Sequence, residues 1–168
     1  MSINYAGATI HYGLLFSDFP EAALPIRSQI PGSVKIRTGI KPSAWTPLQY
    51  EDEELEEAYE EKLSLEDFED PDDFYTLALQ NLASVYEMSI ENLELSAESE
   101  NFGGRWILGV TLVNFGGTEE AGTLAARPLS LTNYNWLLER ARSHELLLQQ
   151  WASTLGTEPP QIILTVQT

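Results

Sequence analysis

The sequence predicts an α+β protein, with a largely antiparallel sheet and helices packed on one of its faces. Several short segments alternate apolar and polar residues, two long segments have apolar residues at helical spacing, and turn-forming residues separate the strands. The chain has 168 residues, of which 43% are hydrophobic and 17 are aromatic. This length and composition predict one folded domain that spans residues 1–168.

The first 50 residues predict two strands, a short helix and a loop. In residues 3–16 two sets of side chains alternate along the chain, as in a strand, and residues that favour strands are common. A short helix is expected at 20–30, before the turn chemistry of Pro31 and Gly32. In residues 33–38 (SVKIRT) apolar and basic residues alternate, which predicts a strand with one face exposed to solvent. Residues 39–50 contain two prolines and one glycine, and therefore predict a loop.

Residues 51–73, the acidic segment, contain fourteen acids and one base, and so carry −13 of the chain's net charge of −17. Apolar residues at helical spacing predict an acidic helical insertion within the domain. The stripe consists of Leu55, Ala58, Tyr59 and Leu63, and Lys62 interrupts it. Asp70 and Pro71 are suited to the N-cap and first position of another helix, which is expected to run to about Tyr86.

The second half of the chain predicts a meander, a long helix and a final strand. Residues 93–98 alternate, residues 105–115 are apolar on both faces and predict a central strand, and a weaker strand is expected at 120–127. The turn sequence NFGG occurs twice, at 101–104 and 114–117. A helix is expected from residue 132 or 133 to about 155, followed by a strand at 161–168.

Composition excludes several classes of function. The net charge of −17 and a pI near 4.2 argue against direct nucleic-acid binding, which needs a basic surface. The absence of cysteine excludes disulfides, thiolate metal sites and cysteine nucleophiles. The first residues lack the basic region of a signal peptide, and no stretch approaches the length of a membrane span. We therefore expect a soluble, cytoplasmic protein that does not contact membranes.

No catalytic or cofactor motif stands out. The two histidines, His11 and His144, lack metal-ligand spacing, and there is no nucleophile elbow, P-loop or dinucleotide-binding fingerprint. The aspartates at 70, 72 and 73 are dense, but the start of a helix already explains them. The sequence therefore predicts no catalytic, cofactor or metal site, and a protein that is not an enzyme.

The leading hypothesis for function is a non-enzymatic interaction protein of inhibitor, immunity, adaptor or chaperone type. Its acidic segment would bind a basic partner surface, with carboxylates supplying association rate and specificity and aromatic rings supplying affinity. The expected partner-binding residues are Glu53, Glu54, Glu56, Glu57, Tyr59, Glu60, Glu61, Asp67 and Phe68. Two other uses of the charge stay open: a solvated face that maintains solubility, and pairing within the fold to the bases of the acid-free residues 22–50.

Three further hypotheses belong to other classes. The acids could imitate nucleic-acid phosphates and so inhibit a DNA-binding protein. A small enzyme or ligand-binding domain would have its pocket between the sheet and the long helix, near His11, Tyr12, Arg105 and His144. A structural subunit would be favoured by an exposed edge strand at 161–167.

Overall fold

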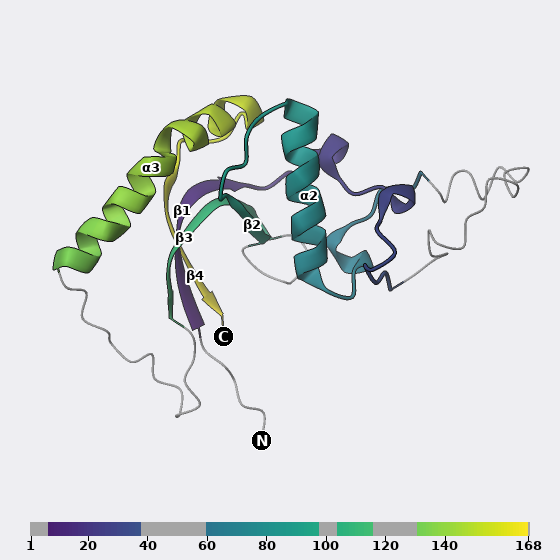
Figure 1. Cartoon of the computed structure of the whole chain (residues 1–168), viewed down its shortest axis with the longest axis horizontal. Helices are drawn as coiled ribbons and strands as arrows, with labels where there is room; N and C mark the ends of the chain where they lie inside the picture. Colours follow the sequence, from purple (N-terminus) through teal and green to yellow (C-terminus); the bar gives the residue numbers. More distant parts are fainter. Residues whose placement is uncertain (1–6, 38–59, 98–103, 116–130, 168) are drawn as a thin grey trace, which may run out of the picture. The chain divides into compact units, whose positions relative to one another are not determined.

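The computed structural model describes residues 7–37, 60–97, 104–115 and 131–167 (Figure 1). The chain divides into two compact units, which are described in turn below. The first unit combines residues 1–18 with 91–168, and the second contains 19–90. An antiparallel sheet together with helices confirms the predicted α+β class. The expectation of one domain over residues 1–168 stays a prediction.

The described strands of the first unit form one four-stranded sheet in the order β2-β3-β1-β4, and every neighbouring pair is antiparallel. The strands are β1 (Gly7–Phe16), β2 (Glu94–Ala97), β3 (Trp106–Phe115) and β4 (Gln161–Gln167). The apolar strand β3 is central, as predicted, because β2 and β1 pair with its two sides.

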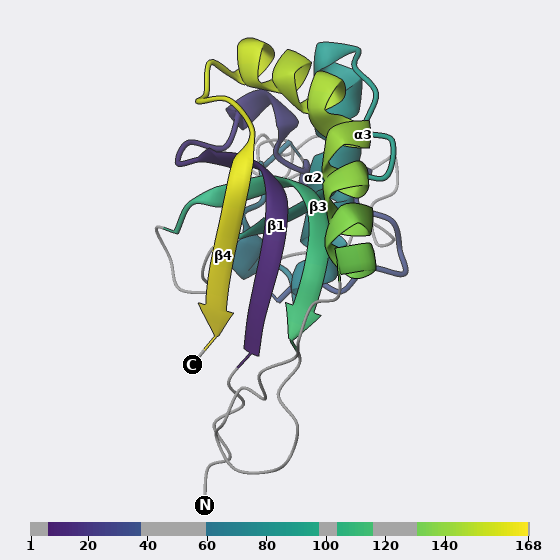
Figure 2. The same cartoon turned by 90° about the vertical axis from the view of Figure 1, so that its left-hand side faces the viewer.

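The helix α3 (Leu131–Leu155) packs against β1 and β3 of the sheet (Figure 2). Its side chains Leu148 and Trp151 are completely buried, as are Leu14 of β1 and Leu108 of β3. Gly156 follows the helix with φ of +67°, the left-handed conformation that ends helices and that glycine adopts without steric cost. The predicted end of this helix is thereby confirmed.

Two glycines, Gly13 of β1 and Gly109 of β3, face each other in the register of the sheet. A Cβ atom on Gly13 would lie 2.8 Å from the Cα of Gly109 and even closer to the carbonyl oxygen of Leu108. A Cβ atom on Gly109 would lie 2.6 Å from the Cα of Gly13. The two backbones therefore approach more closely than any side chain would allow.

The second unit is built around α2 (Pro71–Tyr86), which begins and ends where the sequence predicts. The carboxylate of Asp70 accepts a hydrogen bond of 3.0 Å from the backbone N–H of Asp72, so it caps the helix. Phe74, Ala78 and Leu82 form the buried face of α2. Neither α2 nor α3 combines the length and apolarity that a membrane-crossing helix requires.

Three predicted elements differ from the structure or lie outside the described residues. Residues 20–30 form two short 3-10 helices, Glu21–Ala23 and Arg27–Gln29, and not one helix. Residues 33–37 form no strand and contribute a single bridge between Ile36 and Phe68. The strand expected at 120–127 lies outside the described residues, and the second neighbour of β3 is β1.

The acidic helix is also wrong over the part that the structure describes. Residues 60–64 are not helical, and Lys62 takes part in an isolated bridge with Ile26. Leu63 is completely buried, whereas the side chain of Lys62 is 41% exposed. Residues 62 and 63 therefore behave as extended backbone, in which neighbouring side chains point to opposite sides. The remainder of the predicted helix, residues 55–59, lies outside the described residues.

The glycine contact predicts a loss of stability in Gly13→Ala. We expect the free energy of unfolding to fall by about 2 kcal/mol or more, because the new methyl group meets backbone atoms that cannot rotate away. Urea denaturation followed by circular dichroism measures the change. Gly32→Ala is the control, since a Cβ there would meet nothing within 4 Å. An unchanged transition in Gly13→Ala would contradict the close approach.

Candidate partner-binding site

Residues 60–73, which we call the anchored segment, are the part of the acidic segment that the structure describes. Backbone hydrogen bonds attach this segment to residues 25–37 of the same unit. Four such bonds are Arg27 N–H to Glu61 O (2.9 Å), Leu63 N–H to Pro25 O (2.7 Å), Arg37 N–H to Asp67 O (2.8 Å) and Glu69 N–H to Lys35 O (3.1 Å). These hydrogen bonds therefore hold the backbone that carries the acidic residues.

A buried arginine adds an ion pair to this attachment. The side chain of Arg27 is 5% exposed, and its Nη2 and Nε atoms donate to Oε2 of Glu61 at 2.7 and 3.0 Å. Glu61 itself is half exposed. A buried guanidinium without a carboxylate would destabilise the folded state, so the carboxylate of Glu61 is needed for stability and is not free to bind a partner. The hypothesis that bases of residues 22–50 pair with the acids is confirmed for Arg27.

Two other acids of the anchored segment also serve the local structure. Asp67 accepts hydrogen bonds from the backbone N–H and the hydroxyl of Ser64, at 2.8 and 3.0 Å, and completes a capping box. Asp70 caps α2. At the surface, Lys62 donates to Glu21 at 2.9 Å, and this hydrogen bond together with the charge of Lys62 lowers the pKa of Glu21.

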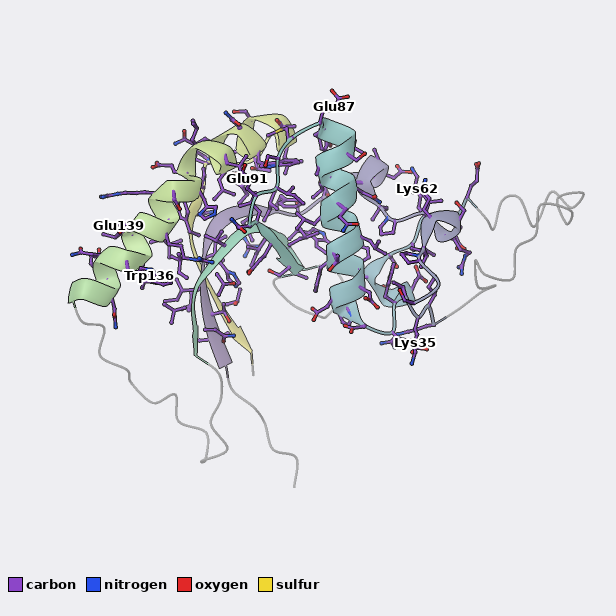
Figure 3. The ribbon with its side chains drawn as sticks, in the orientation of Figure 1. Lys35, Lys62, Glu87, Glu91, Trp136 and Glu139 are labelled. Atoms are coloured by element: carbon purple, nitrogen blue, oxygen red, sulfur yellow. The ribbon has the colours of Figure 1, made fainter. Side chains whose placement is uncertain are left out.

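A third group of acids is exposed and makes no ion pair within the described part of the chain. Its members are Glu60, Glu66, Glu69 and Asp72. Lys62 does not neutralise them, because its ammonium group is paired with Glu21. Lys35, the other lysine of this unit that Figure 3 labels, lies well apart from Lys62 and forms no ion pair with these four acids. These four carboxylates are therefore available to a partner without loss of a described contact.

An open depression lies beside the first turn of α2. It has a volume of about 440 Å³ and is lined by Ser33, Lys35, Glu69, Asp70, Pro71 and Asp73. Three of these residues are acidic and one is basic, so the depression as a whole is negative. Among the described residues, no group of three or more histidine, aspartate or glutamate side chains is arranged to hold a metal ion. The arrangement is suited to receiving a cationic side chain.

The structure separates the sequence-predicted binding residues into distinct roles. Glu53, Glu54, Glu56, Glu57 and Tyr59 lie outside the described residues. Glu60 is exposed, while Glu61 and Asp67 are engaged in the contacts above.

Phe68 has a different place from the one that we expected. Its side chain is 1% exposed, and its ring lies 5.5 Å from that of Phe74 in an edge-to-face arrangement. Phe68 therefore belongs to the core of its unit, and we leave it out of the proposed binding surface. Phe68 follows the short 3-10 helix Leu65–Asp67 and is buried, whereas Glu66 and Glu69 on either side of it are exposed.

Two of the residues proposed for a ligand pocket, His11 and Tyr12, do not share a face of the sheet. His11 and Tyr12 are neighbours on β1, so their side chains point to opposite faces of the sheet. The Nε2 atom of His11 lies 3.3 Å from the Thr165 hydroxyl, while burial, and secondarily the charge of Glu145 on α3, raises the pKa of Tyr12. In α3, Nδ1 of His144 lies 2.9 Å from the carbonyl oxygen of Arg140. No shared cavity follows from these positions.

Comparison with models of protein families, with curated proteins and with solved structures finds no match for this chain.

The Arg27–Glu61 pair predicts different effects for two neighbouring glutamates. We expect Glu61→Gln to lower the free energy of unfolding by about 2 kcal/mol, because it leaves a buried guanidinium with a neutral partner. The matched control, Glu60→Gln, removes an exposed charge and should change stability by less than about 0.5 kcal/mol. Chemical denaturation of both variants measures the difference. Equal effects would show that Glu61 is another surface acid.

The position of His11 predicts a pH dependence of stability. Burial lowers its pKa from 6.5 in the folded state, against a smaller opposing effect of Glu94. Below pH 6.5 the unfolded chain therefore binds a proton more readily than the folded chain, and the free energy of unfolding falls until the lowered pKa is passed. We expect His11→Gln to lose the part of this pH dependence that comes from the imidazole. The denaturation midpoint of the variant should therefore change less with pH. Identical pH profiles would contradict the lowered pKa of the half-buried His11.

Proposed function

We propose that this protein is a non-enzymatic interaction protein whose acidic segment binds a basic surface of a partner protein. The observation that carries the proposal is that the acids of residues 60–73 have two different roles. Some acids hold the segment in place, while Glu60, Glu66, Glu69 and Asp72 are exposed without a described ion pair. If the acids served only the fold, their carboxylates would be engaged in the way that Glu61 is.

A fixed backbone is what distinguishes this surface from a flexible acidic tail. The hydrogen bonds from residues 25–37 hold the backbone that carries the exposed carboxylates in place before the partner arrives. Binding then requires less ordering of the acidic side, so more of the electrostatic attraction appears as affinity. The acids at 53, 54, 56 and 57 precede this segment in the sequence, and we propose that they also contribute to binding.

The proposal is tested with a triple variant, Glu60→Gln, Glu66→Gln and Glu69→Gln, in which no side chain that caps or anchors the segment is changed. A basic protein captured from native lysate by the wild type is purified, and its affinity is measured by calorimetry. We expect the triple variant to bind it at least about tenfold more weakly. Raising the salt concentration from about 0.05 to 0.5 M should weaken the wild-type complex and reduce the difference between the proteins.

The control removes the same amount of charge from the other unit, through Glu139→Gln, Glu145→Gln and Glu158→Gln, which are also exposed positions. It should bind like the wild type, because the attraction is local and not a property of net charge. A second variant, with glutamine at 53, 54, 56 and 57, reports on the earlier half of the segment. Equal binding by the triple variant and the wild type at low salt would refute the proposal.

A further inference from the structure

The two edges of the sheet differ in how they are protected against pairing with another chain. The edge strand β2 has four residues and carries a charge at Glu94, and both features discourage pairing. The other edge, β4, has seven residues, QIILTVQ, with no charged residue and no proline. Among the described residues only β1 pairs with β4, so the outer backbone groups of β4 have no described partner.

The side chains of β4 are also apolar where they are exposed. Ile162, Leu164 and Val166 alternate along the strand and so share one face of the sheet, with exposed fractions of 66%, 63% and 55%. The helix α3 contacts β3 and β1, and in Figure 2 it lies over β3 and leaves β4 uncovered. Three exposed β-branched or leucine side chains beside an unpaired strand edge are typical of a surface that pairs.

The sequence of β4 is complementary to itself. When two copies pair antiparallel about a two-fold axis at Leu164, this residue faces Leu164 of the second copy. Ile162 then faces Val166 of the second copy, and Val166 faces its Ile162, so every cross-strand pair on this face is apolar. Such pairs contribute to the stability of a sheet, and the backbone groups of both edges are satisfied at the same time. A two-fold contact requires a surface of this self-matching kind.

The absence of charge on β4 permits a second copy to occupy this edge. Two chains that each carry −17 repel one another over most of their surface, and the repulsion is weakest where neither copy presents a charge. Each copy presents an uncharged β4 there, so pairing brings no carboxylates into opposition along the strand. We propose that this protein forms a two-fold dimer by antiparallel pairing of β4 with β4 of a second copy, centred on Leu164.

The test uses the full chain and light scattering after size exclusion, at loading concentrations from about 1 to 100 μM. The wild type should reach a mass twice the 18.8 kDa of one chain. Leu164→Lys and Leu164→Glu each place two like charges opposite one another at the axis, so each variant alone should remain a monomer. Because Leu164 is exposed, both variants should keep the circular dichroism spectrum and melting behaviour of the folded chain.

The decisive measurement is an equimolar mixture of the two variants. In the proposed register lysine of one copy faces glutamate of the other, so the mixture should recover the dimer mass that neither variant reaches alone. A monomeric wild type at the highest concentration would overturn the proposal, as would dimers of either single variant. A mixture that stays monomeric would overturn the two-fold register at Leu164. The proposal does not depend on the acidic segment.

Discussion

The buried guanidinium of Arg27 is the interaction on which the position of the anchored segment depends. It lies under a surface that is otherwise dominated by carboxylates, and its partner Glu61 is the point where the fold uses negative charge instead of exposing it. The bridges at Ile26 and Ile36 and the backbone hydrogen bonds form on either side of this pair. An acidic stretch that would repel itself in isolation is thereby held beside residues that contain no acid.

Sequence was most informative where one local rule decides the structure. Asp70 and Pro71 start α2, glycine ends α3, and the doubly apolar β3 occupies the centre of the sheet, because capping, turn chemistry and two-sided burial are local or nearly local properties. The failures involve contacts between distant residues. The pairing of β1 with β3 and the bridge between Ile36 and Phe68 join segments that sequence spacing cannot align.

The candidate site shows the same limit. The sequence identifies the acidic segment and the acid-free residues 22–50, and it predicts pairing between their charges as one use of the acids. It could not assign Glu61 to Arg27, nor separate Phe68, which is buried, from the exposed carboxylates around it. Apolar residues at 55, 58, 59 and 63 fit a helical period, but Lys62 and Leu63 alternate as in extended backbone, and only the bridge to Ile26 distinguishes the two patterns.

The facing glycines divide the sheet along its length. Gly13 is the last residue of β1 that pairs with β4, and Gly109 is the residue of β3 at which pairing with β2 ends. On one side of this row the sheet consists of β3, β1 and β4, and on the other side of β2, β3 and β1. The row that contains these glycines has side chains only at its ends, on Glu94 and Gln161, so the two inner strands carry none at the point where each loses its outer partner.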